Sequence, residues 1–288
     1  MKKILALSSA LTMIAGVAQA QSSIAAPTPE WTVAGNASLN SDYRFRGFTQ
    51  TNYAPAMQGG IDIAHRSGFY VGNWNSNVSS ALQNGGPLEV DLYGGFKGEA
   101  APGLGYDVGV LYYYYPQSGV DREGIRWTQN NNAVFTNKKV NNQELYLGFT
   151  YGAWSAKLFY QTADYFKMAE MAGVVNNTTL ESTKGTTYLD LNYTQDVNGL
   201  ILGAHYGLLT VKHYDQGNNL TMSADVGGGA LPKSVGDYKF SVGKDIGAGY
   251  ILTGAYIGTT KKGYFATDLG ARTAAGKPGL VVSVGKTF

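Results

Sequence analysis

The three histidines, His65, His205 and His213, have the widest chemical use in this sequence, because imidazole serves both as a general base and as a metal ligand. A lipid hydrolase would need one of them beside a serine, with a third group that orients the base. No serine stands at a neighbouring strand position in a matching motif, and no histidine or carboxylate group has metal-ligand spacing. We therefore expect no catalytic residue, metal or cofactor, and a lipid hydrolase that uses His65 or His205 is the least favoured alternative.

The charged residues show a regular pattern: within apolar segments they stand at alternate positions. In residues 31–45, Trp31, Val33 and Leu39 alternate with polar residues, and the same register continues to Tyr43 and Phe45. Such alternation is typical of a strand with one apolar and one polar face. We predict 12 strands, in segments 31–45, 56–66, 68–76, 87–99, 104–115, 143–151, 153–161, 186–195, 200–209, 236–244, 249–258 and 279–288.

The connections between these segments alternate between short and long. Short turns fall near residues 66–68, 99–103, 151–153, 195–199 and 245–249, and long polar connections at 47–55, 77–87, 116–142, 163–184, 211–234 and 260–277. Outer-membrane barrels have this asymmetry, with an even number of strands of about 10 residues each. The sequence therefore predicts a 12-stranded antiparallel transmembrane β-barrel with short periplasmic turns and long extracellular loops, of which the third could fold inward and narrow the path.

The alternative is a soluble β-sandwich, whose strands also alternate. Composition counts against it: charged residues make up 15% of the chain, compared with about a quarter in soluble domains. The polar strand faces are rich in glycine, asparagine and serine, and the chain holds 39 glycines and 21 tyrosines. No segment after the first 20 residues has the length of apolar sequence that a transmembrane helix needs. These features favour the membrane barrel.

Aromatic residues gather at the ends of the predicted strands. Amphipathic rings prefer the headgroup level of a bilayer, so two girdles are expected at the edges of the apolar band. We predict an aromatic girdle of Trp31, Phe69 and Trp154 near the short turns, and of Tyr43, Phe45, Trp74, Tyr112 and Tyr114 near the long loops.

The first 20 residues have the features of an export signal. Lys2 and Lys3 precede an apolar run that ends at Ala18-Gln19-Ala20, a small-residue cleavage site. We predict a signal peptide over 1–20, a flexible lead over 21–30 and the barrel over 31–288. Cleavage would remove two of the 22 basic residues and none of the 20 acidic ones, so the exported chain would be neutral and would lack the basic surface of a nucleic-acid-binding protein.

The last strand ends in an aromatic residue. Phe288 shares its face with Leu280, Val282 and Val284, which is similar to the terminal signature of outer-membrane proteins that the barrel-assembly machinery reads. We predict a C-terminal assembly signal there and expect that machinery and outer-membrane lipid as partners.

One family resemblance rests on the N-terminal region. The family's S-D-Y-x-F-R-G-F start falls on Ser41, Asp42, Tyr43 and Phe45 to Phe48, and the similarity continues through "EVDLYGGF" and "YDVGVLYYYYP" to Phe288. The chain thus resembles the TorF family of porin-like proteins of the proteobacterial outer membrane. The resemblance implies a β-barrel with a suspected channel role and no settled substrate.

The polar strand faces are expected to line a water-filled interior, as in outer-membrane channels. The predicted lumen-lining residues are Asp42, Arg44, Arg46, Asp62, Glu89, Asp91, Asp107, Lys157, Asp190, Asp237 and Lys239. Both signs of charge are present, so ion preference is expected to be weak, with Arg44 and Arg46 as an anion-contacting constriction. We predict a channel for passive diffusion of small hydrophilic solutes or ions. A structural or adhesive surface protein with a plugged lumen is the alternative, since 12-stranded barrels lie between filled and open sizes.

Overall fold

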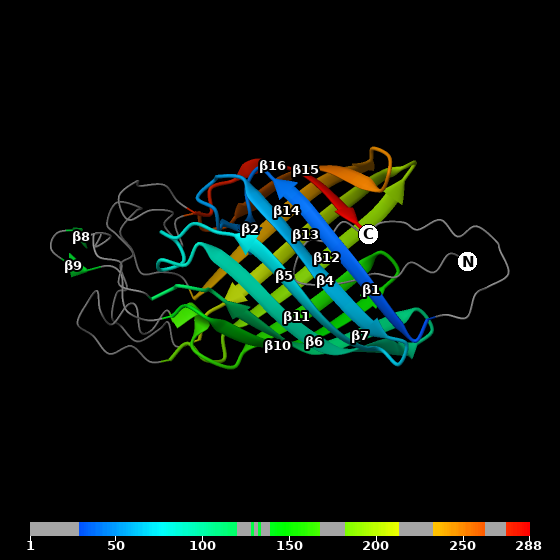
Figure 1. Cartoon of the computed structure of the whole chain (residues 1–288), viewed down its shortest axis with the longest axis horizontal. Coiled ribbons are helices and arrows are strands. Elements are labelled where there is room, and N and C mark those ends of the chain that lie inside the picture. Colours follow the sequence, from blue (N-terminus) through cyan, green and yellow to red (C-terminus); the bar gives the residue numbers. More distant parts are fainter. Residues whose placement is uncertain are drawn as a thin grey trace.

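The computed structural model describes residues 29–119, 128–129, 132–133, 139–167, 182–212, 233–262 and 275–288. Twelve antiparallel strands close into a barrel in the order β1-β16-β15-β14-β13-β12-β11-β10-β7-β6-β5-β4, which is seen from the side in Figure 1. The predicted fold class is confirmed. The predicted signal peptide and most of the flexible lead lie outside the described residues.

Each barrel strand pairs with its neighbours in the sequence, and β1 pairs with β16 to close the sheet. The barrel strands are β1 (Trp31–Asn40), β4 (Ala56–His65), β5 (Phe69–Asn77), β6 (Leu88–Ala101), β7 (Leu104–Tyr114), β10 (Asn142–Tyr151), β11 (Trp154–Gln161), β12 (Thr187–Val197), β13 (Leu200–Thr210), β14 (Ser234–Asp245), β15 (Tyr250–Thr259) and β16 (Gly279–Thr287). The remaining elements are β2 (Arg44–Phe45), β3 (Phe48–Thr49), β8 (Thr128–Gln129), β9 (Asn132–Ala133) and the 3-10 helix η1 (Tyr165–Lys167).

The two ends of the barrel differ as the connection lengths predict. Five turns of two to four residues join β4 to β5, β6 to β7, β10 to β11, β12 to β13 and β14 to β15 at one end, here called the tight end. β1 begins and β16 ends there, whereas all the long connections leave the opposite, loop end (Figure 1). Within the described ranges, no helix is long and apolar enough to cross a membrane.

The two faces of each strand differ in burial. On β6, Leu92 is 50% exposed, whereas Glu89 and Asp91 are almost completely buried. β10 alternates in the same way, with Leu145 and Leu147 exposed and the residues between them buried. In a single closed sheet, buried strand residues face the interior, so the apolar residues form the outer surface and the charged ones the inner wall.

Tyrosine and glycine are common because they pack together on the inner wall. A Cβ atom at Gly72 of β5 would overlap the Tyr93 ring of β6, and one at Gly207 of β13 would overlap the Tyr188 hydroxyl of β12. The same contact joins Gly109 to Tyr146. Tyrosines therefore lean across the sheet over neighbouring glycines, which is a known way of compensating for a missing side chain in a strand.

Replacing Gly72 with valine should destabilise the barrel by about 1–3 kcal/mol, the usual cost of overpacking. The Tyr93 ring cannot simply move away, because its hydroxyl donates to Asp62 Oδ1 at 2.6 Å. Gly254→Val is the matched control, since a Cβ there meets nothing within 4 Å. Urea unfolding of the barrel in lipid vesicles would measure both variants, and equal stabilities would contradict the packing argument.

One departure from the predicted strands matters for function. β1 ends at Asn40, not at Phe45, and the chain then turns into the barrel. Tyr43 is buried and its hydroxyl donates to Glu89 of the inner wall, while Phe45 packs on Tyr113. The prediction that Tyr43 and Phe45 belong to the outer girdle is therefore wrong. Trp74 is also an inner residue, since it is buried in edge-to-face contact with Tyr43.

Candidate functional site

The first long connection forms a hairpin inside the barrel. β2 and β3 pair through Arg44 with Thr49 and Phe45 with Phe48, so Arg46 and Gly47 make the turn. Both turn residues have positive φ, +49° and +80°, as a type I′ turn requires. We call residues Arg44–Thr49 the inner hairpin.

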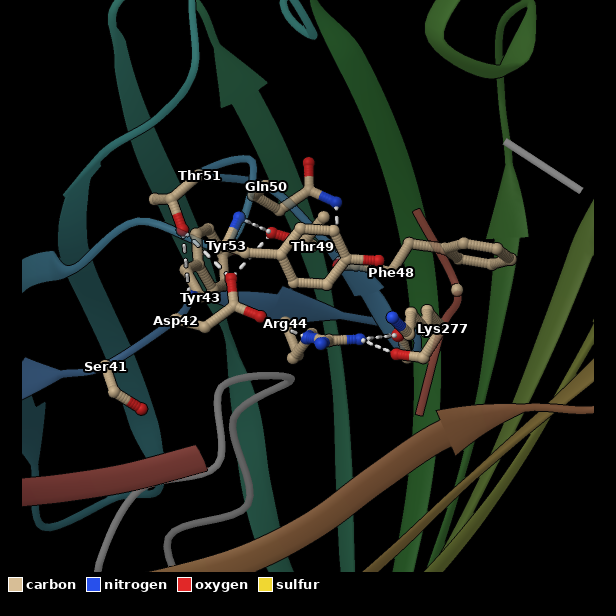
Figure 2. Close-up of polar contacts among 12 residues, drawn as sticks. Ser41, Asp42, Tyr43, Arg44, Phe48, Thr49, Gln50, Thr51, Tyr53 and Lys277 are labelled. Carbon is tan, nitrogen blue, oxygen red and sulfur yellow. Dashed lines mark hydrogen bonds and ion pairs between the residues drawn. The ribbon is translucent and has the colours of Figure 1, made fainter. Parts of the chain in front are cut away.

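Asp42 fixes the base of the inner hairpin, as Figure 2 shows. Its carboxylate accepts hydrogen bonds from Thr49 Oγ1 at 2.6 Å and Thr51 Oγ1 at 3.0 Å, and it forms an ion pair with Arg44. Arg44 also donates to the Lys277 carbonyl oxygen at 3.0 Å, which ties the hairpin to the segment before β16. The hairpin is therefore held at its base by both charge and hydrogen bonds.

The tip of the inner hairpin reaches the far wall of the barrel. Arg46 Nη2 donates to Glu144 Oε1 of β10 at 2.6 Å, and Nη1 donates to the Tyr165 hydroxyl at 3.1 Å. The side chains of Arg46 and Glu144 are only 3% and 1% exposed, so this ion pair is shielded from solvent. Four aromatic rings surround the guanidinium carbon, those of Tyr188, Phe45, Tyr165 and Phe159, with centroids 4.2, 4.7, 5.6 and 5.7 Å away.

Tyrosine hydroxyls hold the carboxylates around the hairpin. Glu89 accepts from Tyr43 and Tyr115, each at 2.6 Å, and Glu144 accepts from Tyr113 at 3.0 Å. Burial, together with the negative charge of Glu89, raises the pKa of the Tyr43 phenol, so it remains a donor. The hairpin is thus joined to β6 as well as to β10.

Several polar atoms near the hairpin have no partner. Both Asp91 carboxylate oxygens are buried without a hydrogen bond. In the sheet, Asp91 of β6 and Asn142 of β10 both lie opposite Tyr113 of the strand between them, β7. Such groups are rare in proteins because each costs free energy. The buried side-chain atoms without a partner among the described residues are Asp91 Oδ1 and Oδ2, Arg46 Nε, Asn142 Nδ2 and Gln161 Oε1.

Further polar groups line the wall toward the tight end. Lys157 Nζ lies 2.7 Å from Asp107 Oδ2, and Asp107 also accepts from the Tyr70 hydroxyl at 2.5 Å. On β12 to β14, His205 lies between two carboxylates, with Nε2 2.8 Å from Asp237 Oδ1 and Nδ1 3.3 Å from Asp190 Oδ1. No group of histidine or acidic side chains among the described residues is placed to hold a metal ion.

The wall of β1, β4 and β16 is different, because its inward polar side chains near the loop end carry no charge. Asn40 donates to Gln58 Oε1 at 2.9 Å and to Ser38 Oγ at 3.1 Å. Ser38, Asn40, Gln58 and Ser283 all keep partial exposure to solvent. The interior is therefore asymmetric, with packed aromatic and charged side chains on one side and small, partly exposed polar ones on the other.

The structure places the predicted lumen residues on the inner side of the barrel: Asp42, Arg44, Arg46, Asp62, Glu89, Asp91, Asp107, Lys157, Asp190, Asp237 and Lys239. Arg44 and Arg46 do not present free guanidinium groups for the predicted anion-contacting constriction. Arg44 forms an ion pair with Asp42, and Arg46 forms one with Glu144. Glu144 was not predicted, although the alternation that turns Leu145 and Leu147 outward places it inward.

The predicted girdle residues other than Tyr43, Phe45 and Trp74 lie on the outer surface. Trp31, Phe69 and Trp154 begin their strands at the tight end, and Tyr112 and Tyr114 lie near the loop end of β7. Leu280, Val282, Val284 and Phe288 share the outer face of β16 and its end. The Phe288 backbone exchanges two hydrogen bonds with Gly35 of β1.

His65 has polar neighbours that the sequence did not indicate. Ser67 Oγ lies 2.8 Å from His65 Nδ1, and Glu30 Oε1 lies 3.2 Å from Nε2. A hydrolytic triad also joins a serine and an acid to one histidine, but there the serine contacts Nε2 and the acid Nδ1, the reverse of the contacts here. The Ser67 backbone N–H also donates to Nδ1 at 3.2 Å. These contacts are exposed and join the β4–β5 turn to the start of β1, with the His65 ring against Trp31.

Three solved structures illustrate what the fold is similar to. The NanC porin has 8% identity, with 89% of this chain and 99% of that one covered, and a TM-score of 0.49. The KdgM porin in complex with disordered oligogalacturonate has 9% identity, coverage of 89% and 97%, and a TM-score of 0.43. The outer membrane protein OpdK of Pseudomonas aeruginosa has 13% identity, coverage of 92% and 68%, and a TM-score of 0.38. These TM-scores lie below 0.5, so the fold assignment rests on the strand order itself.

No curated protein matches the sequence. A family model described as a bacterial protein of unknown function, Gcw_chp, matches residues 24–288 and so covers the whole barrel. That description does not carry the TorF name, and the TorF resemblance stays a prediction. The chain belongs to the bacterial Gcw_chp family.

Proposed function

We propose that this protein is a porin-like channel of the bacterial outer membrane, through which small hydrophilic solutes or ions diffuse passively. The observation that carries the proposal is the contrast between the two barrel faces, apolar and exposed outside, charged and polar inside. A closed barrel leaves no unpaired strand edge, which lets it cross a bilayer, and a polar interior is the feature of water-filled channels. In this role the protein transports solutes and catalyses no reaction.

The outer surface supports placement in lipid. The rings of Trp31 and Trp154 at the tight end and of Tyr112 at the loop end, all exposed, would lie at the two headgroup levels. We infer that Phe288 and the outer face of β16 form the signal that the assembly machinery reads. The expected partners are thus lipid, that machinery and the solute.

The path would run beside the inner hairpin, along β1, β4 and β16. Ser38, Gln58 and Ser283 are short or flexible, keep partial exposure and carry no charge. Hydrogen-bonding groups of this kind suit neutral polar solutes as well as hydrated ions. The opposite wall, where Arg46 and Glu144 are buried, would narrow the channel.

Planar-bilayer recording of the refolded barrel tests the channel. We expect discrete conductance steps in potassium chloride, and no steps above the bare membrane would reject the proposal. The second candidate function is a structural or adhesive barrel with a plugged lumen, favoured by the burial of the hairpin. It predicts no steps from the wild type together with binding of the loops to a surface.

Ser38→Trp should reduce the conductance several-fold, because the indole would project from β1 into the proposed path. Leu39→Trp is the matched control, since Leu39 is 54% exposed on the outer face of the same strand. It should conduct like the wild type. Single-channel recordings of the two variants at equal salt would measure the difference, and equal conductances would place the path elsewhere.

A further inference from the structure

We propose that the pocket around Arg46 is a binding site for small organic cations of the guanidinium class, and that Arg46 occupies it as a tethered ligand. This inference rests on the proposed channel function, because it names the solute class that the far wall would recognise. The pocket, here called the cation cage, consists of Glu144, Phe159, Tyr165 and Tyr188.

The cation cage has the two features that organic cations require. Glu144 supplies a carboxylate at 2.6 Å from Nη2, and the Tyr188 ring lies 4.2 Å from the guanidinium carbon. Aromatic faces attract cations through their quadrupole, and the attraction is strongest where water is excluded. Guanidinium is planar and weakly hydrated, so it loses less than an ammonium or metal ion on entering such a site.

Three of the four cage residues do not depend on the inner hairpin for their positions. Glu144 belongs to β10, Phe159 to β11 and Tyr188 to β12, so all three project from the barrel wall. The Glu144 carboxylate is also held by the Tyr113 hydroxyl and by Gln161 Nε2. The Tyr188 hydroxyl donates to Asp237 Oδ2 at 3.1 Å. If the hairpin left, the Glu144 carboxylate and the rings of Phe159 and Tyr188 would stay where they are.

Arg46 occupies the cage with an unfavourable backbone conformation and one unsatisfied donor. It has φ of +49° in a turn whose counterpart between β12 and β13 is Asn198-Gly199, with φ of +54° and +79°. Asparagine is preferred at that position and arginine is not. In addition, Arg46 Nε is buried without a partner. The contacts of the cage therefore hold the Arg46 side chain in place at a cost in free energy, which comes from backbone strain and from the missing hydrogen bond of Nε. A free cation would have neither of these costs.

Two further carboxyl groups, Glu89 and Asp91 of β6, are buried on the neighbouring wall, and among the described residues neither forms an ion pair with a basic side chain. Glu144 pairs with Arg46. Displacing Arg46 would leave the Glu144 carboxylate without its counter-ion. A cation that enters would replace the charge that the arginine supplies, whereas an anion would be repelled.

Arg46→Asn is the informative variant, because asparagine suits the turn while it removes the guanidinium. Ethylguanidinium binding to the refolded barrel would be measured by isothermal titration calorimetry at constant ionic strength, with sodium as the reference cation. We expect saturable binding to Arg46→Asn and binding at least about ten-fold weaker to the wild type, whose own arginine leaves the site open only a fraction of the time. Equal binding to both would overturn the inference.

Two double variants test the cage itself. Arg46→Asn with Glu144→Gln should lose binding, and Arg46→Asn with Tyr188→Leu should lose it as well. Arg46→Asn with Tyr188→Phe keeps the ring and should retain it. Arg66→Ala, in an exposed turn at the tight end, controls for loss of an arginine and should behave like the wild type. Binding that survives both the glutamine and the leucine change would contradict the assignment.

Calorimetry keeps this test separate from the test of the channel. If neither the wild type nor Arg46→Asn conducts, the channel proposal fails, yet the binding result still decides whether the cage takes guanidinium. If both conduct, ethylguanidinium should lower the conductance of Arg46→Asn toward the wild-type level and should have little effect on the wild type. Conduction without any ethylguanidinium effect or binding would reject the cation cage alone.

Discussion

Removing the inner hairpin should raise the conductance of the refolded barrel several-fold. A suitable variant replaces Arg44–Thr49 with Asn-Gly, because the Gln50 N–H donates to the Tyr43 carbonyl at 2.8 Å and a two-residue type I′ turn can close there. The variant loses the Arg46 and Phe48 side chains that fill the interior. Single-channel recordings at one salt concentration would measure the gain, and wild-type conductance in the variant would show that the hairpin does not obstruct the path.

A reversible cross-link distinguishes a fixed hairpin from a movable one. The chain has no cysteine, so Gly47→Cys with Thr259→Cys introduces a single pair. A Cβ at position 47 would lie 2.6 Å from Thr259 Cγ2, so the two positions are in contact, and the hairpin tip would have to shift slightly to reach the usual disulfide Cβ–Cβ spacing of about 3.5–4.5 Å. If the hairpin moves during conduction, reduction should raise the conductance above that of the oxidised form. Equal conductance in both forms would mean that solutes pass beside a static hairpin.

The barrel could be predicted from the sequence because its signal is local. Strand alternation depends on neighbouring residues, and a polar residue between two apolar ones faces inward wherever the strand runs. Glu89, Asp91 and Asp107 are all buried, as that rule predicts. The same rule would have placed Glu144 inward, because the alternation turns Gln143, Leu145 and Leu147 outward.

The inner hairpin could not be predicted in the same way. The alternation from Trp31 to Phe45 resumes at Tyr43 after a single polar residue, Ser41, at an apolar position. One such residue is too weak a signal to mark the end of β1 at Asn40. The available signal was Arg46-Gly47 between two aromatic residues, which fits a two-residue turn, although arginine is an unusual first turn residue. The ion pair to Glu144 joins residues 98 positions apart and is a product of barrel closure.

The outward prediction for Tyr43 was wrong for a physical reason that applies to any tyrosine of the inner wall. Tyrosine rings are apolar enough for a lipid face, and the sequence gives no sign of which hydroxyls find partners. In the structure, the Tyr113 hydroxyl donates to Glu144 and the Tyr188 hydroxyl donates to Asp237. The Tyr113 ring packs on Phe45, and the Tyr188 ring packs on the Arg46 guanidinium. A tyrosine is compatible with either face, so its place is decided by contacts across the barrel.

Glu144→Ala should be the most damaging single change at the hairpin tip. It leaves a buried guanidinium without its counter-ion, which costs about 3–5 kcal/mol in other proteins. Arg46→Asn should cost less, because Glu144 keeps its hydrogen bonds from Tyr113 and Gln161. The double variant removes both charges, and its loss should be well below the sum of the two single losses. Urea unfolding in vesicles would give the three free energies.

The hairpin itself limits the loss that Glu144→Ala can cause. An unpaired Arg46 can return to water if the hairpin leaves the lumen, so the cost to the barrel cannot exceed the free energy of hairpin docking. Trp74, which contacts Tyr43 at the hairpin base, would report this release as a fluorescence change at low urea, before the strands unfold. We therefore expect two transitions in Glu144→Ala and one in the double variant. A single transition in Glu144→Ala, with losses that simply add, would show that the ion pair does not hold the hairpin in place.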